Sequence, residues 1–159
     1  MRAYEIFAAM TPERAAQVLE TLRAQSPGVY TQAVAAASVA FKARPRFLMT
    51  QPHDKRAHLV RRALARVAAN DLAEEVLAAY FLESRRPLLV EWLDAAGVPH
   101  EDGTLTGDEP QAPPREQLEA IVRCFLGGEE RPDRELLLRA FAAQSAVTWP
   151  DLESLLQGS

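Results

Sequence analysis

The chain is poor in the residues that mark secreted, membrane-spanning and metal-cluster proteins. Its one cysteine, Cys124, allows neither an internal disulfide nor a cysteine-based metal cluster, which fits a reducing compartment. The first ten residues contain Glu5 and too short an apolar stretch for a secretory signal. No run approaches the roughly 18 apolar residues that a membrane span needs. These absences predict a cytoplasmic protein without a membrane partner.

Motifs that bind phosphates, metals or cofactors are missing as well. No Gly-x-Gly-x-x-Gly or Gly-Lys-Ser pattern occurs, so the nucleotide-binding loops built on them are not expected. His53 and His58 lie about 140° apart on a helix, and no histidine precedes them, so with Asp54 they fit no metal-ligand pattern. Cys124 falls late in a predicted helix, where the dipole disfavours a thiolate, and we expect a buried structural thiol. The sequence predicts no catalytic residue, cofactor or metal, and favours a non-enzymatic protein.

What the sequence has is helical periodicity. Hydrophobic residues make up 48% of 159 residues, enough for a core of ordinary size. They recur at spacings of three and four, and no segment shows sustained strand-like alternation. Residues 28–42 are almost entirely small or apolar, which favours a central helix. We predict an all-α fold, an irregular multi-helix bundle of about eight helices. A helical-hairpin (HEAT-like) array is the alternative, from a faint similarity between residues 61–77 and 137–156.

Helix-ending and helix-starting residues support this interpretation. Thr11 and Ser26 each precede a proline and are expected to cap helices, as is Asn70. Gly97 and the pair Gly127-Gly128 are expected to end helices in the left-handed conformation.

One segment breaks the helical pattern. Residues 97–114 hold four prolines, three glycines and four acids with no basic residue. A connection of this length without structure is usually functional or mobile. We predict a single helical domain over residues 1–159, with an acidic Pro/Gly-rich loop at 97–114. Trp92 and Trp149, on either side of that loop, are expected to anchor the core.

Charge is unevenly distributed along the chain. The whole chain carries −4, but residues 42–66 hold eight basic residues and one acid, Asp54, a local charge of +7 that leaves −11 elsewhere. At about 100° per residue, one helix face collects four basic or imidazole side chains. They are Lys55, His58, Arg62 and Arg66. We call these four residues the cationic stripe. It either binds a partner or is a solvated face neutralised by nearby carboxylates such as Glu74 and Glu75.

Three functional hypotheses follow. The leading one is a non-enzymatic protein-interaction module, an adaptor or regulator that binds a protein partner or a second copy of itself through the cationic stripe. The second is a nucleic-acid-associated protein that uses the basic 42–66 stretch on phosphates, although no nucleic-acid-binding motif accompanies it. The third is a small-ligand or metal-dependent enzyme with a site at the 97–114 loop, formed by His100, Glu101 or Asp102. A polar turn at 101–103 is the simpler interpretation of that loop.

Overall fold

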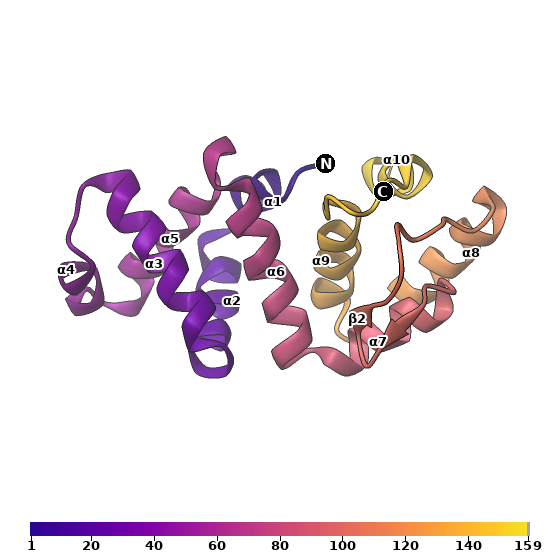
Figure 1. Ribbon diagram of the computed structural model, residues 1–159, viewed down its shortest axis with the longest axis horizontal. Coiled ribbons are helices and arrows are strands. Elements are labelled where there is room, and N and C mark those ends of the chain that lie inside the picture. The colour runs from indigo at the N-terminus through magenta and orange to yellow at the C-terminus, as the bar shows by residue number, and fades with distance from the viewer. Residues whose placement is uncertain (159) are drawn as a thin grey trace. The chain divides into compact units, whose positions relative to one another are not determined.

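The computed structural model describes residues 1–158 and is almost entirely helical (Figure 1). Within those residues it contains ten α-helices, one 3₁₀ helix and a two-stranded hairpin. The elements are α1 (Ala3–Ala9), α2 (Pro12–Gln25), α3 (Pro27–Phe41), α4 (Pro45–Thr50), α5 (His53–Leu64), η1 (Val67–Ala69), α6 (Asn70–Ser84), α7 (Arg86–Ala95), β1 (His100–Glu101), β2 (Thr104–Leu105), α8 (Arg115–Leu126), α9 (Arg131–Ala142) and α10 (Pro150–Gln157). The all-α prediction is confirmed. The two additional helices, α1 and α4, span only seven and six residues, too few for a helical period to be recognised.

The described chain divides into two compact units. One comprises residues 2–84 and the other comprises Met1 with residues 85–158; we call them the N-terminal and C-terminal units. Residues 61–77 lie in the first and residues 137–156 in the second, and each spans two helices and their connection. The single domain and the HEAT-like array stay predictions.

In the N-terminal unit, α5 packs against α2 and α3, while α6 packs against α1 and α2. Their facing sides supply a core of fully buried side chains, among them Phe7, Leu19, Leu22, Leu64 and Leu77. The prediction that residues 28–42 form a surrounded central helix is wrong. Helix α3 buries one face only, and Val39 on its other side is 81% exposed. Apart from Val39, the exposed side of the helix carries small or polar residues, among them Thr31, Gln32 and Ala35.

In the C-terminal unit, helices α7 to α10 surround a cluster of four aromatic rings. The Trp92 ring centroid lies 5.4 Å from that of Phe125 and 5.7 Å from that of Phe141, and Phe141 lies 5.0 Å from Trp149. Trp92 is fully buried and Trp149 is 3% exposed, so both core-anchor predictions are confirmed. The Trp149 indole N–H also donates to the carbonyl of Pro110 at 2.8 Å. This bond ties the end of the 97–114 loop to the core.

The predicted helix ends are confirmed in part. Thr11 accepts a hydrogen bond from the Arg14 N–H at 3.2 Å, and Gly97 adopts a φ of 69° directly after α7. Ser26 precedes α3, but its side chain makes no capping bond. Asn70 does not cap α6, because η1 leads directly into that helix. The side-chain oxygen of Asn70 accepts a hydrogen bond from the Tyr4 N–H instead. Gly127 keeps a negative φ of −77°.

The hairpin within the 97–114 loop corrects the expectation of no strands. Strands β1 and β2 pair antiparallel, with Glu101 opposite Thr104. Between them, Asp102 has a φ of 50° and Gly103 a φ of 94°. Positive φ at both central positions defines a type I′ turn, for which Asp-Gly is a favoured pair. The strands are two residues each, so no alternation of apolar and polar residues was available to predict them.

Candidate functional site: a cationic surface beside α4 and α5

Helix α5 separates its side chains into a buried face and a charged face. Its buried face contains Arg56, Ala57, Val60, Ala63 and Leu64. The cationic stripe lies on the other side: Lys55, His58 and Arg62 are exposed along the helix, and Arg66 is exposed two residues beyond its end. The structure therefore exposes all four residues to solvent, with Lys55, His58 and Arg62 on one face of α5 and Arg66 beyond the end of that helix.

The cationic stripe is not neutralised within the part of the chain that the structure describes. None of its four side chains forms an ion pair or a side-chain hydrogen bond with another residue of 1–158. Glu74, one of the carboxylates expected to neutralise it, instead accepts a hydrogen bond from the Asn70 amide at 3.1 Å. Exposed cations that form no ion pair within the protein are available to bind an anion on another molecule.

Arg62 contacts the last residue of α3. Its guanidinium lies over the Phe41 ring, 5.0 Å from the centroid, a cation–π geometry. This contact uses the flat face of the guanidinium and leaves its N–H groups without a hydrogen-bonding partner among the described residues. Phe41 is followed by Lys42, whose φ of 52° turns the chain toward α4. The Arg62 end of the stripe therefore lies beside the start of the 42–51 segment.

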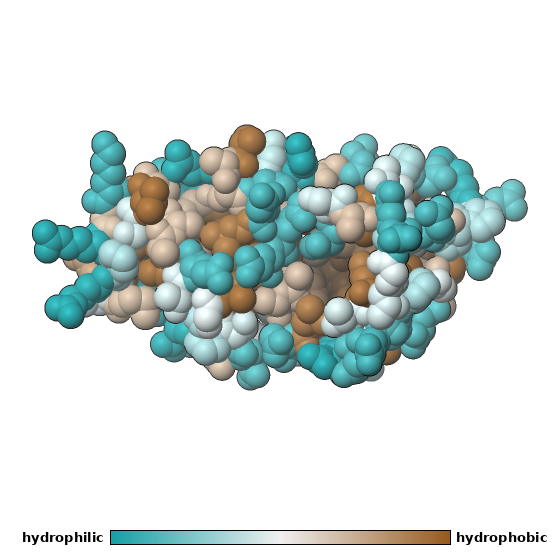
Figure 2. All heavy atoms as spheres, viewed as in Figure 1, coloured by the Kyte–Doolittle hydropathy of each residue, from teal (hydrophilic) through white to brown (hydrophobic). Residues whose placement is uncertain are grey.

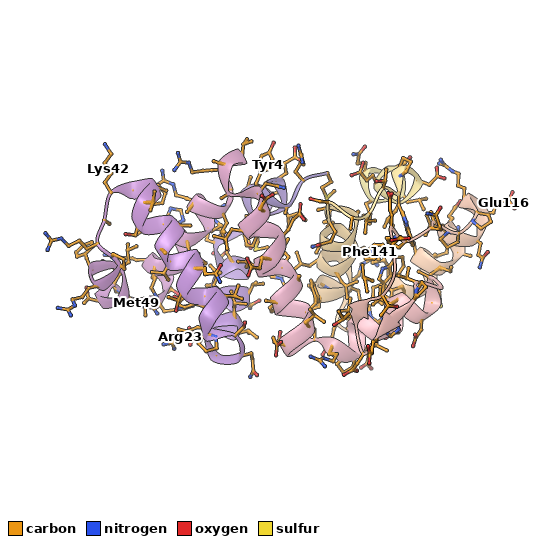
Figure 3. The ribbon with its side chains drawn as sticks, in the orientation of Figure 1. Tyr4, Arg23, Lys42, Met49, Glu116 and Phe141 are labelled. Carbon is orange, nitrogen blue, oxygen red and sulfur yellow. The ribbon has the colours of Figure 1, made fainter. Side chains whose placement is uncertain are left out.

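The 42–51 segment itself exposes both cations and apolar side chains. Lys42, Arg44 and Arg46 are exposed, and so are Phe47 (55%) and Met49 (48%). Figure 2 shows hydrophilic side chains projecting from the α3–α4 end of the N-terminal unit with hydrophobic ones exposed beside them, and Figure 3 shows Lys42 and Met49 at this end. Large exposed apolar side chains next to unpaired cations are typical of contact surfaces.

Helix α4 has one inward and one outward side. Leu48 is fully buried and faces inward. At about 100° per residue, Phe47 and Met49 flank Leu48 on its two sides and Arg46 points almost directly away from it. The outward arc of α4 therefore runs from Met49 through Arg46 to Phe47.

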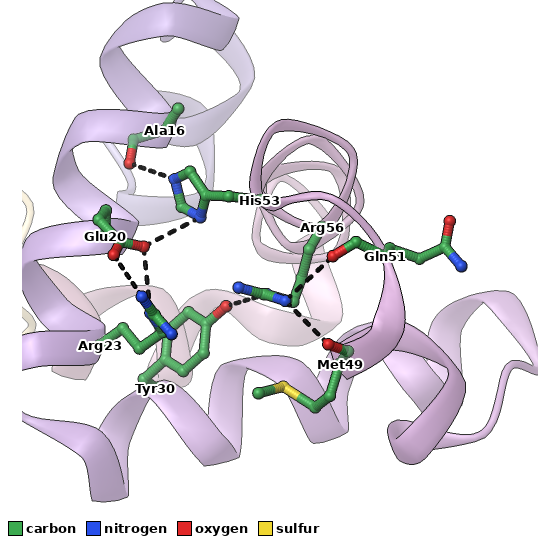
Figure 4. A network of polar contacts seen from close by, with 8 residues as sticks. All are labelled: Ala16, Glu20, Arg23, Tyr30, Met49, Gln51, His53 and Arg56. Atoms are coloured by element: carbon green, nitrogen blue, oxygen red, sulfur yellow. Dashed lines mark hydrogen bonds and ion pairs between the residues drawn. The ribbon is translucent and has the colours of Figure 1, made fainter.

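A buried arginine fixes α4 against α5 (Figure 4). Arg56 is 6% exposed and donates from Nε to the Tyr30 hydroxyl at 2.6 Å. Its Nη1 donates to the carbonyls of Met49 and Gln51, each at 3.2 Å. One side chain of α5 thus joins α3 to the C-terminal end of α4, and the end of the 42–51 segment lies beside the first turn of α5.

A second set of polar contacts near this one joins α5 to α2 through Glu20. Its carboxylate receives two hydrogen bonds from Arg23, at 3.1 and 2.5 Å, and lies 3.0 Å from Nδ1 of His53. The Arg23 hydrogen bonds and, after them, the nearby charges of His53 and Arg23 lower the pKa of Glu20. Nε2 of His53 lies 3.1 Å from the Ala16 carbonyl. His53 therefore ties α5 to α2.

Two of the eight basic residues in 42–66, Arg56 and Arg61, point into the unit, although the prediction from sequence included them in the surface charge. Arg56 is buried, and Arg61 donates to the carbonyls of Phe7 (3.3 Å) and Met10 (3.2 Å) at the end of α1. The helical period could have predicted that Arg56 is buried, because Arg56 is four residues before Val60 and therefore on the apolar face of α5. Six of the eight basic residues remain on the surface: Lys42, Arg44, Arg46, Lys55, Arg62 and Arg66.

Each of the three candidate residues in the 97–114 loop contacts α7 or solvent. Nε2 of His100 lies 2.6 Å from Asp94, and its Nδ1 accepts from the Gly103 N–H at 3.0 Å, which assigns the neutral ring its proton on Nε2. Asp102 accepts from Arg86 at 2.7 Å, and Glu101 is exposed on β1. Within residues 1–158 no three His, Cys, Asp or Glu side chains are grouped to hold a metal ion.

Cys124 corrects a further expectation. The thiol was expected to be buried, but the residue is exposed on α8. Helix α8 buries Leu118, Val122 and Phe125, and position 124 lies about 200° around the helix from Val122 and about 100° from Phe125. The apolar neighbours in sequence therefore face away from it.

Comparisons with known proteins identify no relative. No family model matches the chain, and neither a curated protein sequence nor a solved structure is significantly similar to it. No helix in the described part of the chain has the length and apolarity required to cross a bilayer.

Charge divides between the two units of the chain. Residues 2–84 contain 11 basic and 8 acidic residues, a net charge of +3. Residues 85–159 contain 7 basic and 14 acidic residues, a net charge of −7. The acidic pI of the whole chain is therefore a property of the C-terminal unit, and the N-terminal unit by itself is basic.

Proposed function

We propose that this protein is a non-enzymatic interaction module that binds an acidic protein partner through the cationic stripe. The observation that carries the proposal is that Lys55, His58, Arg62 and Arg66 are exposed and form no ion pair or side-chain hydrogen bond with any described residue. A protein gains little stability from such an arrangement, because like charges on one face repel each other. An acidic partner would relieve that repulsion. We place this activity in the cytoplasm, on the evidence of the single cysteine.

The partner's charge affects both encounter and retention. Charges separated by more than about 8 Å are largely screened at physiological salt, so the stripe acts at short range once the surfaces meet. Complementary charge raises the association rate and excludes basic partners. Binding should therefore weaken steeply as salt increases.

Affinity capture from lysate tests the proposal. The baits are the wild-type protein, the Lys55→Glu/Arg62→Glu/Arg66→Glu variant, and Arg139→Glu as control. Arg139 is an exposed arginine of α9 in the C-terminal unit. We expect the wild type and the control to retain the same acidic proteins at low salt, and the triple variant to lose them. Identical captured sets for all three baits would contradict the proposal.

A second copy of the chain is one acidic partner to consider, because the C-terminal unit carries −7. Static light scattering at low and high salt measures this directly. Self-association through the cationic stripe predicts a larger particle at low salt that becomes a monomer at high salt and in the triple variant.

The N-terminal unit also supports nucleic-acid binding as a second candidate, because it carries a net charge of +3 although the whole chain carries −4. The cations would then contact phosphates. Each phosphate contact on duplex DNA contributes about −0.9 to the slope of log affinity against log salt. Filter binding with duplex DNA should give a slope near −3 if three cations are used, and the triple variant should abolish it. An absence of binding at low salt would eliminate this candidate.

A further inference from the structure

We infer that the segment bound by this surface is an amphipathic helix whose acidic residues face the cationic stripe and whose apolar residues contact the exposed side chains of α4. This inference rests on the function proposed above for the same surface. Three features support it: the spacing of the cations, the contacts between the 42–51 segment and α5, and the scarcity of exposed large apolar side chains in the described part of the acidic C-terminal unit.

The spacing of the cations matches a helical ligand. Lys55, His58 and Arg62 lie on α5 at intervals of three and four residues, which corresponds to about 4.5 Å and 6 Å along the axis. A second helix placed alongside offers carboxylates at the same intervals, because it has the same rise. An extended strand repeats its same-face side chains every 6.6 Å or so, and falls out of register by the third cation.

Contacts with α5 hold both ends of the 42–51 segment. At one end, Arg62 stacks on Phe41, the residue before Lys42. At the other, Arg56 holds the carbonyls of Met49 and Gln51 against the first turn of α5, next to Lys55. The two ends of the segment therefore lie near opposite ends of α5, and a ligand lying on the stripe has α4 within reach.

The flank that α4 presents is apolar as well as basic. Phe47 and Met49 are about half exposed on either side of Arg46. A purely acidic polymer would satisfy the cations and leave these two side chains in water. A ligand that carries leucine or phenylalanine next to its carboxylates buries them, and each such side chain contributes a hydrophobic gain that salt does not screen.

A second copy of this chain does not supply both chemistries. Within the described C-terminal unit, the only large hydrophobic side chain that is exposed is Leu105, at 36%. A contact between two N-terminal surfaces would bring Phe47 and Met49 together but would also place Arg44, Arg46 and Lys42 against their own copies. The occupant is therefore a segment of a different protein.

Selection of peptides against the full-length wild-type protein tests the inference. The probe is a displayed library of random 16-residue peptides, and enriched sequences are synthesised and titrated by fluorescence anisotropy. We expect enriched peptides to carry net negative charge and apolar residues at i, i+3, i+4 and i+7. Their far-ultraviolet circular dichroism should show a gain of helix on binding.

Variants separate the inference from the function on which it rests. Affinity should fall at least tenfold in Phe47→Ser/Met49→Ser and in Lys55→Glu/Arg62→Glu, and should stay within twofold in Arg139→Glu. Phe47 and Met49 are exposed, so their replacement leaves the core intact. Two results would overturn the helical ligand but not the acidic partner. One is acidic peptides that bind without gaining helix, and the other is acidic peptides whose affinity is unchanged in the Phe47→Ser/Met49→Ser variant. Enriched peptides with no acidic bias would overturn both.

Discussion

Replacing Arg56 tests how α4 is held in place. The Arg56→Met substitution keeps most of the side-chain length and removes the guanidinium. Three hydrogen bonds are lost, at 2.6 Å to the Tyr30 hydroxyl and at 3.2 Å to each of the carbonyls of Met49 and Gln51. The carbonyls belong to the end of α4, so the loss falls on the joint between α4 and α5.

The magnitude follows from the bonds and their burial. A hydrogen bond to a charged donor contributes about 1.5 kcal/mol or more, so three give roughly 4.5 kcal/mol. Methionine recovers part of this, on the order of 1–2 kcal/mol, because the guanidinium no longer has to be desolvated in a site where Arg56 is 6% exposed. We expect Arg56→Met to reduce the free energy of unfolding by about 3 kcal/mol.

A double-mutant cycle isolates the Arg56–Tyr30 bond. Tyr30→Phe removes the hydroxyl, which leaves the buried Nε without an acceptor, and should cost about 1–2 kcal/mol. In the double variant that cost should largely disappear, a coupling of about 1–2 kcal/mol. Arg46→Met, at an exposed arginine of α4, is the matched control and should change stability by less than about 0.5 kcal/mol.

Urea unfolding followed by circular dichroism at equilibrium gives these free energies, and amide hydrogen exchange reports α4 separately. We expect the α4 amides to lose protection in Arg56→Met. The reasoning is refuted if Arg56→Met is as stable as Arg46→Met, or if the cycle shows no coupling between Arg56 and Tyr30.

Three further predictions concern pH, the core and a helix end. Hydrogen bonds from Arg23 are the main cause that lowers the pKa of Glu20 below its ordinary value of 4.5. The ionised carboxylate therefore stabilises the fold above pH 4.5, and this stabilisation is lost as the pH falls through the lowered pKa. Acid unfolding of Glu20→Gln should therefore show a shallower pH dependence below 4.5 than wild type. Trp149→Phe removes the bond to the Pro110 carbonyl and should cost about 2 kcal/mol and speed proteolysis within residues 97–114, with an unchanged digestion rate counting against the role of that bond. Gly97→Ala meets no atom within 4 Å but must hold a φ of 69°, so thermal unfolding should show a loss of about 1 kcal/mol, and a stabilised protein would contradict this.

The fold class was predictable because most helices are long enough to show their period. Helices α1 and α4 were not, at seven and six residues, and neither was a hairpin with two-residue strands. The exposure of Val39 was missed because local composition does not reveal which side of an apolar helix lacks a neighbour. Tertiary packing decides that.

The candidate surface was predictable to a similar extent. The helical period alone placed Lys55, His58 and Arg62 together on the exposed side of α5. It did not show that the stripe is unpaired, which depends on where the carboxylates of α6 point. Nor did it show that Phe47 and Met49 are exposed beside it, since apolar residues are expected inside. The first property depends on α6, and the second on the way Arg56 and the buried Leu48 hold α4.

Site-specific photo-cross-linking in the living cell tests the central claim most directly. A benzophenone amino acid at position 58 lies in the middle of the cationic stripe, and the same residue at position 139 serves as control. The account predicts cross-links from position 58 to acidic segments of another protein, which disappear when Arg62→Glu is added, and no such products from position 139. Cross-links that form equally from both positions, or that survive Arg62→Glu unchanged, would contradict it.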